Sequence, residues 1–490
     1  MTRMKADTAK VIFNHEWKIL SRNKVLVALF AIMLAMLFSA LWIGSSMLKK
    51  QQQTISKIKV HEAETLDSLK SRIQRIEANN MVRPGFIWDD PTYAYNTARN
   101  EGPKFAIKIP FILQALNVGQ SDLQPFYYKV YIRKKQYLTY EKEIENSFLQ
   151  FIGNFDFAFV IIYLFPLLII VFTYNIHSIE KEQGTWVLLK TSNQSISKLI
   201  LFRTGIRYAL FTLAFWLMVI LILNLLIGGS FLYSTNWWWT VGYVSLYFAF
   251  WFGLSFLVNS FSMSSNLNAM VLIFLWLFTG IIVPNILQIG LNKIYPIPSR
   301  ISLTTEERNA INHYFEKDGQ ALTKEVFSNP RAMIRQASVV TPEMVYGYGV
   351  IVSKMQEIQD VATDIAEQKL YGQIEKQQMM IKSLQLISPA LMMQEELSAL
   401  SGTHWHQFNN FSIDVDTFRK ESQRFYYPKM AYDSTYRTFT IKDAEAIPTF
   451  KAREYADYSW SNIKQTFLSY LIITGALFWI GYRKLLQSQR

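Results

Sequence analysis

Long runs of apolar residues alternate with polar stretches along this chain of 490 residues. The runs cover residues 25–47, 157–174, 206–227, 237–258, 267–283 and 467–482. About 20 apolar residues in a helix cross the roughly 30 Å of a bilayer's hydrocarbon core, so each run has about the length of a membrane span. Arg207 is the one charged residue within them, and Asp156 lies just before the second. The pattern predicts an all-α polytopic membrane protein with six transmembrane helices.

Two polar stretches are much longer than the loops between neighbouring spans. Residues 48–154 follow the first run, and residues 284–466 precede the sixth. Apolar residues from Ile55 to Ile76 keep helical spacing up to Pro84-Gly85, so we expect the first span to continue outward as a stalk. From Ile351 to Ile365 they recur in steps of four and three, which predicts a helix packed against a neighbour such as the stalk.

Two shorter stretches within these loops, 80–95 and 425–436, are rich in Tyr, Pro, Asn and Asp. This composition favours irregular structure or short strands. Together with the two predicted helices it indicates a mixed, largely helical extracytoplasmic domain built from both long loops.

An amphipathic helix is predicted before the first span, within residues 1–24. Phe13, Trp17 and Leu20 fall on one helical stripe. The opposite stripe is polar and mostly basic: Lys10, Asn14, Lys18 and Arg22. A basic amphipathic helix lies in the membrane interface with its apolar face toward lipid. The alternative is a frayed leader, but the paired stripes favour an elbow helix on the inner leaflet.

The net charge of +13 is concentrated in three short segments. Residues 1–24, 177–205 and 483–490 together carry +9, whereas residues 48–154 carry +5 and residues 292–464 carry −1. Short loops rich in Lys and Arg stay on the cytoplasmic side, and long loops cross the membrane largely regardless of charge. We therefore expect both termini in the cytoplasm. The basic charge is explained by membrane orientation and does not indicate nucleic-acid binding.

Several kinds of chemical site need residues or motifs that this sequence lacks. Cysteine is absent, which removes disulfides, thiolate metal sites and cysteine nucleophiles. No phosphate-binding loop of the form G-x-x-x-x-G-K-[ST] occurs, so the chain alone is not expected to hydrolyse ATP. His404 and His406 form a weak candidate for a metal site, because no third ligand can be identified. We expect no catalytic residue and no cofactor held by this chain.

A short motif lies between the second and third runs. It reads Glu180-Lys181-Glu182-Gln183-Gly184-Thr185. This resembles the E-x-E-x-G-T signature of ABC-2 type transporter permeases, in which the loop after the second transmembrane helix docks on a cytoplasmic ATPase. The elbow helix, the six spans and the internal termini agree with that family. The alternative is an ordinary solvated loop with a chance match.

Further stretches narrow the resemblance. They are Gly153–Phe159, Leu164–Leu168, Ser388-Pro389, Ser401–Thr403 and His406–Phe408. These look like the ABC-2 permease branch that carries the domain of unknown function 3526. Members of that branch have large extracytoplasmic insertions after the first helix and before the sixth, where this chain has its long loops.

The resemblance implies a permease subunit of the bacterial cytoplasmic membrane that exports an unidentified substrate. A separate ATPase subunit would bind ATP and Mg, and a second permease subunit would complete a homodimer or heterodimer surrounded by membrane lipid. Glu180, Glu182, Gly184 and Thr185 would then be the ATPase-coupling residues. Acidic side chains pair with a basic groove or cap a helix, glycine adopts backbone conformations that other residues resist, and threonine caps a following turn.

The outer end of the fifth span carries a second candidate. Gly280 and Pro284 would break a helix there, which fits the outer gate of the family and equally fits an ordinary helix end. Two alternative functions stay open as well. One is a mechanotransmitter that drives an extracytoplasmic partner without conducting a substrate, and the other is a membrane-anchored scaffold with no ATPase.

Overall fold

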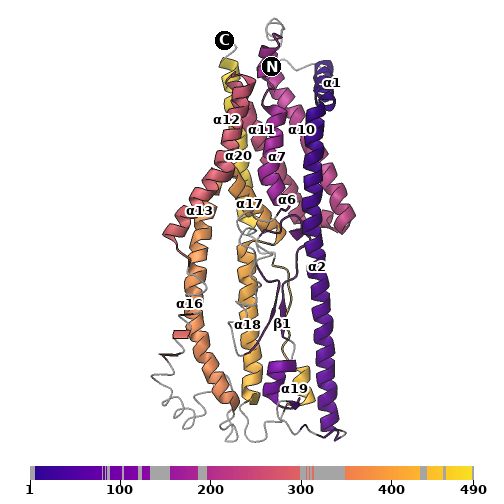
Figure 1. Cartoon of the computed structure of the whole chain (residues 1–490), viewed down its shortest axis with the longest axis vertical. Coiled ribbons are helices and arrows are strands. Elements are labelled where there is room, and N and C mark those ends of the chain that lie inside the picture. The colour runs from indigo at the N-terminus through magenta and orange to yellow at the C-terminus, as the bar shows by residue number, and fades with distance from the viewer. Residues whose placement is uncertain are drawn as a thin grey trace.

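A single helix, α2 (Lys24–Glu77), runs from the bundle of apolar helices far into the outer domain (Figure 1). Its 54 residues form a rod of about 80 Å at 1.5 Å per residue. Asn23 begins it, because its side-chain oxygen accepts hydrogen bonds from the amides of Val25 and Leu26. Buried residues continue along its outer half as far as Ile76. The predicted stalk is therefore confirmed.

The computed structural model describes most of the chain. The described residues are 6–79, 81–82, 84, 89–101, 104–119, 124–132, 155–185, 196–297, 305, 308–309, 312–313, 348–430, 439–455 and 460–487. Both the first helix, α1 (Ala6–Arg22), and the end of the last helix, α20 (Trp460–Gln487), lie at the same end of the molecule (Figure 1).

Six helical stretches of these residues are long and apolar enough to cross a membrane, and each contains one of the six predicted runs. They are α2, residues Phe157–Glu182, α10 (Ile196–Ile227), α11 (Thr235–Ser260), residues Ser265–Ile294 and α20. The mostly helical class, with several helices that could span a membrane, is confirmed. That these six and no others cross the bilayer stays a prediction.

The bundle is built around α11, whose apolar window is more deeply buried than that of any other candidate span. It packs mainly against α20, and also against α7 (Phe165–Thr173) and α17 (Pro389–Ser401). Four phenylalanine rings from three helices meet edge to face at 5.0–5.9 Å or stack at 5.6 Å: Phe165, Phe211, Phe215 and Phe248. Such geometries favour aromatic pairs beyond the area they bury.

Two of the candidate spans contain a π-helical turn. In the second, η4 (Val160–Leu164) separates α6 (Phe157–Phe159) from α7. In the fifth, η6 (Phe278–Ile282) separates α12 (Ser265–Leu277) from α13 (Val283–Ile294). Gly280 lies in this turn and Pro284 lies in the first turn of α13, so the helix does not end there as one reading predicted. A proline lacks an amide hydrogen, and a π turn accommodates that loss without stopping the helix.

The outer domain combines long helices with one small antiparallel sheet. Strand β1 (Phe105–Ile107) pairs with β2 (Tyr127–Lys129), with Ala106 opposite Tyr128. Helix α16 (Tyr348–Leu384) packs on α18 (Trp405–Met430) through the buried guanidinium group of Arg419, which binds Asp360 at 2.8 Å. The other short elements are α3 (Ala94–Asn96), η2 (Thr97–Glu101), η3 (Ile112–Ala115), α8 (Ser178–Glu182), η5 (Gly229–Tyr233), η7 (Gln385–Ile387) and α19 (Ile441–Glu445).

Two expectations for this domain need correction. Residues Phe425–Met430 are not irregular but form the end of α18, because Tyr426, Tyr427 and Met430 are buried in a core with the stalk and the packing outweighs local composition. The 351–365 stripe lies on a helix as predicted, but α16 packs on α18 and α13 rather than mainly on the stalk. Ile365 is exposed, and the side chains of Ile351, Met355, Ile358 and Ala362 lie outside the described set.

Several of the family-like stretches are helix caps in this structure. Asp156 caps the start of the second span and also accepts the amide of Val118 at 3.0 Å, which ties the outer domain to the bundle. Ser388 caps the start of α17, and Gly402 ends α17 with a left-handed φ of 77°. The side chain of Gln407 then joins α17 to α18 by accepting the amide of His404 and donating to the carbonyl of Ala399.

Candidate functional site

The predicted coupling motif begins on α8, a five-residue helix that forms the last part of the second candidate span. Glu180 and Glu182 are both on this helix, and Gly184 and Thr185 follow it in a turn. Gly184 has a φ of 74°, and a Cβ added there would meet no other atom within 4 Å. Its glycine is therefore required by the left-handed backbone and not by close approach. The rest of the predicted segment, from Trp186 to Ser195, lies outside the described residues.

Glu180 is engaged within the chain. Its Oε1 accepts a hydrogen bond from Arg203 Nη1 of α10 at 2.7 Å. Its other carboxyl oxygen accepts the hydroxyl hydrogen of Thr185, which also points at the Glu180 carbonyl at 3.1 Å. Thr185 therefore closes the turn back onto α8. One charge of the E-x-E motif is used to hold α8 against the third span.

Arg203 also joins α8 to the elbow helix through a second carboxylate. Glu16 of α1 is fully buried and binds Arg203 with one oxygen and Arg207 Nε with the other, at 2.6 Å for the latter pair. Arg207 donates in addition to the carbonyl of Phe172, at the end of the second span. Burial opposes ionisation, yet Arg207 and Arg203 hold the pKa of Glu16 below its usual value.

This ion cluster is balanced in charge. Glu16 and Glu180 bind Arg203 and Arg207, so two negative and two positive groups lie together in one largely buried cluster. Unpaired charges are costly in such a setting, while a complete set with good geometry is tolerated. The cluster fastens α1, α8 and the inner part of α10 to one another.

Glu182 fastens α8 to the fifth span. Its two oxygens accept the backbone amide and the hydroxyl of Ser265, both at 2.8 Å. Ser265 is the first residue of α12, and a carboxylate at a helix N-terminus is favoured by the helix dipole and by the amides that lack helical partners. The hydroxyl of Ser178, at the start of α8, lies 2.7 Å from the same serine hydroxyl.

The turn before α8 is bound to the fourth span. Asn259 of α11 donates to the carbonyl of Thr173 at 3.0 Å, and its own carbonyl lies 2.9 Å from Nδ1 of His177. Asn268 of α12 donates to the carbonyl of Tyr174 at 3.1 Å. These two amide side chains cap the last carbonyls of α7. We call α8 and its bonded partners on α1, α10, α11 and α12 the inner hub.

The elbow residues divide between two surroundings. Phe13 and Trp17 are about half exposed, as a face toward lipid requires, whereas Leu20 packs against the main core. The amphipathic helix is present, and it docks on α2 and α10 through Ile12 and Glu16. Sequence reasoning missed Glu16 as a partner. The available signal was Glu16, an acid in the middle of a basic helix, together with Arg207, the one charge within the predicted spans.

The two histidines of the weak metal candidate are close but already engaged. Nε2 of His404 lies 2.8 Å from Glu395 Oε2, and Nδ1 accepts the amide of His406 at 3.2 Å. Among the described residues no cluster of three or more His, Asp and Glu is arranged to hold a metal ion. The pair instead links α17 to the start of α18.

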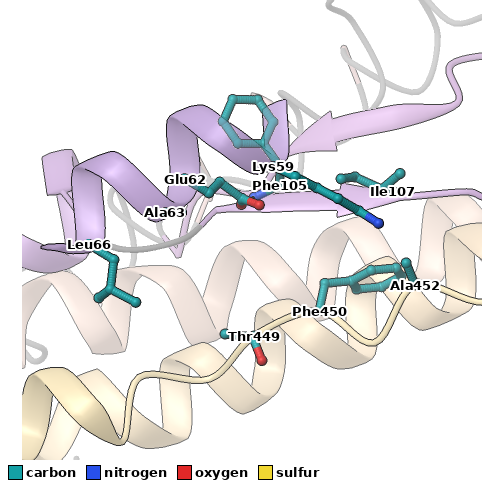
Figure 2. Close-up of a pocket in the computed structure, with 9 residues that line it drawn as sticks. All are labelled: Lys59, Glu62, Ala63, Leu66, Phe105, Ile107, Thr449, Phe450 and Ala452. Atoms are coloured by element: carbon teal, nitrogen blue, oxygen red, sulfur yellow. The ribbon is translucent and has the colours of Figure 1, made fainter. Parts of the chain in front are cut away.

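The outer domain contains a cavity of about 290 Å³ between the stalk, β1 and residues 449–452 (Figure 2). Phe105 and Ile107 line the strand side, and Phe450 and Ala452 line the loop side. Glu62 of the stalk also borders the cavity, but its Oε1 accepts the amide of Phe105 at 2.9 Å and so holds β1 on α2. None of the sequence-predicted site residues lines this cavity.

Comparison with protein families gives one match. Residues 301–453 match the family described as domain of unknown function 3526. No curated protein and no solved structure matches the chain. The matched region is less than half of the chain, and its described part includes α16, α17, α18 and α19 but not the inner hub.

Proposed function

We propose that this chain is the permease subunit of an ABC-2 type transporter, which couples ATP hydrolysis by a separate ATPase subunit to export of a substrate. The observation that carries the proposal is the inner hub. A short helix at the predicted cytoplasmic end is bonded directly to α10 and α12. It is linked to the elbow through Arg203, which also binds Glu16, and to α11 through His177, the residue that precedes it. A displacement of α8 would therefore be transmitted to several candidate membrane helices at once.

The proposed mechanism uses this connectivity. ATP binding would close two ATPase subunits, and their motion would reach the chain through residues 177–205. Because Glu180 and Glu182 bind inside the chain, we assign them the role of holding α8 rigid. Contact with the ATPase would then involve the outer surface of this segment, and Gly184 and Thr185 would shape its turn. ATP and Mg would be bound by the partner alone.

The experiment is co-expression of the chain with an ABC ATPase encoded beside it. We expect a stable complex and ATP hydrolysis that depends on the permease, while the chain alone hydrolyses no ATP. Replacing both Glu180 and Glu182 with Gln should uncouple hydrolysis from transport, and Glu64→Gln on the exposed stalk surface serves as the matched control. If no ATPase co-purifies and hydrolysis is unaffected by the chain, the scaffold alternative is favoured.

One structural feature favours the mechanotransmitter as a second candidate. The stalk α2 begins beside the elbow and continues unbroken into the outer domain, so motion at the inner end would reach the outer domain through one rigid element. Reconstitution in liposomes separates the two functions. Substrate export by the purified complex supports a transporter, and activity that appears only with an extracytoplasmic partner supports a mechanotransmitter.

The proposal includes the assembly and its membrane. Exposed apolar side chains along the fifth span, such as Met270 and Phe274, suit either membrane lipid or a second permease subunit. We place the complex in the bacterial cytoplasmic membrane with both termini inside, as the charge pattern predicts.

A further inference from the structure

Helix α17 lies against the bundle at the end of the spans nearest the outer domain (Figure 1). It packs on α11 and on both π-helical turns, η4 and η6. Ser388 donates to the carbonyl of Thr279 in η6 at 2.6 Å, and Asn236 of α11 donates to the carbonyl of Leu400 at 3.1 Å. Met392, Met393 and Leu397 are fully buried within the main core.

One carboxyl group is buried in the middle of this contact. Glu396 of α17 has no exposed surface, and neither of its oxygens makes a well-formed hydrogen bond with the described residues. The hydroxyl groups of Thr466 on α20 and Tyr243 on α11 lie beside it. A buried carboxylate without donors is strongly disfavoured, so its protonation state decides whether this packing is stable.

The two neighbouring hydroxyls lower the pKa of Glu396, but by less than burial raises it, and each also directs its hydrogen to a backbone carbonyl. Tyr243 donates its hydrogen to the carbonyl of Ile463 at 2.6 Å, and Thr466 donates its own to the carbonyl of Asn462 at 3.0 Å. Thr466 Oγ1 already accepts a hydrogen bond from Gln385 Nε2 at 3.3 Å. A neutral carboxylic acid has one hydrogen that it can donate to one nearby oxygen, and an ionised carboxylate has none.

We propose that Glu396 is a proton-binding site that holds α17 on α11 and α20 while it carries its proton. Separation of α17 from these helices exposes the carboxyl group to water, where it ionises and releases the proton. The ligand is a single proton, and the site links the packing of the outer end of the bundle to pH. It lies away from the inner hub and does not depend on the proposed ATPase partner.

The charged groups around the site do not cancel the effect of burial. Glu395 lies next to it on α17, Lys382 approaches from α16, and Tyr243 is the titratable group on α11. Burial is the main cause that raises the pKa of Glu396 to about 8. At the far end of α17, Lys108 donates to the carbonyl of Gly402 at 2.9 Å, and burial lowers its pKa to about 8 as well.

The direction of the pH dependence follows from linkage. The packed state has the raised pKa and the separated state has the ordinary one near 4.5, so the packed state is fully favoured below about pH 4.5. As pH rises from there to about 8, the ratio of separated to packed molecules should increase by up to about tenfold per pH unit. Above about pH 8 the ratio of separated to packed molecules should no longer change.

The test uses the full-length protein in lipid nanodiscs. The chain has no cysteine, so labels can be placed at Gln394→Cys on α17 and Lys464→Cys on α20 without other changes. Pulsed electron paramagnetic resonance then measures the distance distribution between pH 5 and 9. The infrared carbonyl band of a protonated carboxylic acid is recorded on the same samples, and it should be present at pH 7 and lost in Glu396→Gln.

Two matched variants decide the outcome. Glu396→Gln keeps a hydrogen-bond donor and cannot ionise, so its distances should stay short at every pH. Glu395→Gln changes the neighbouring carboxylate and should keep the wild-type pH dependence. Any pH dependence of the distance that remains in Glu396→Gln is due to other titratable groups such as Lys108. Wild-type distances that do not change with pH, or an unchanged acid band in Glu396→Gln, would overturn the proposal.

Discussion

Replacement of Glu16 by Gln is the most direct test of the inner hub. The change removes one negative charge from the balanced cluster and preserves the size of the side chain. Arg203 keeps Glu180 as a partner. Among the described residues Arg207 has no second carboxylate, so it is left with a neutral amide and the carbonyl of Phe172.

The expected cost follows from this geometry. Two unit charges about 4 Å apart interact by about 4 kcal/mol at an effective dielectric constant of about 20, and breaking a buried pair by removing one partner costs about 3–5 kcal/mol. The amide of Gln can still accept one hydrogen bond, so we expect the lower value, about 3 kcal/mol. That corresponds to an increase of somewhat more than a hundredfold in the population with α1 detached.

Amide hydrogen exchange across α1, measured in nanodiscs, reports this population directly. We expect the exchange of residues 6–22 to accelerate by about two orders of magnitude in Glu16→Gln, while Glu64→Gln leaves it unchanged. The double variant Glu16→Gln with Arg207→Met removes the unpaired charge and should recover most of the protection. Unchanged exchange in the single variant, or additive loss in the double variant, would refute the role of the cluster.

The ion pairs of Glu16 also predict the direction in which docking of α1 depends on pH. The pKa of Glu16 in the folded protein lies below its usual value near 4.5. Its contribution to docking of α1 is therefore present above about pH 4.5 and is lost as the pH falls through the lowered folded-state value. Alkaline pH should leave it intact.

Three further predictions concern other parts of the chain. Gly402→Ala forces a left-handed φ of 77° and a contact of 2.5 Å with a neighbouring phenylalanine ring, so it should lower thermal stability by about 1–3 kcal/mol, whereas Gly205→Ala, with open space at its Cβ, should be neutral or stabilising. Glu182→Gln removes a carboxylate from the start of α12 and should slightly lower stability, measured by denaturation in detergent. A cysteine at Lys376 should react with an impermeant thiol reagent in spheroplasts and one at Lys190 should not; the reverse result would invert the topology.

The amphipathic patterns were the most informative part of the sequence. Each predicted apolar run lies within a helix of sufficient length, and the periodic residues from Ile55 to Ile76 continue the first of them as a stalk. These features depend on neighbours one to four positions apart, which a single chain displays directly. The same locality explains the error at Phe425–Met430, where burial against the distant stalk outweighs a composition typical of loops.

The sequence identified the coupling motif, but it did not predict the contacts that the residues of the motif make. Glu180 and Glu182 were expected to pair with a basic ATPase groove or to cap a helix. Glu182 binds the first residue of α12, Ser265, and Glu180 binds Arg203 within the chain. Contacts between residues 83 positions apart, as for Glu182 and Ser265, depend on how helices are placed beside one another. Side-chain type and spacing along one helix do not determine that placement.

By itself, the sequence determined the long apolar helices that could span a membrane, the elbow helix and the stalk, because hydrophobic periodicity is a local property that burial in lipid or core demands directly. It also indicated which short segment to examine as a coupling element. Only the tertiary structure decided that Glu16 completes an ion cluster with Arg203 and Arg207, and that Glu396 is enclosed where α17 packs on α11 and α20. The physical reason is that the energy of a buried charge is determined by the groups around it in space, and these come from helices far apart along the chain.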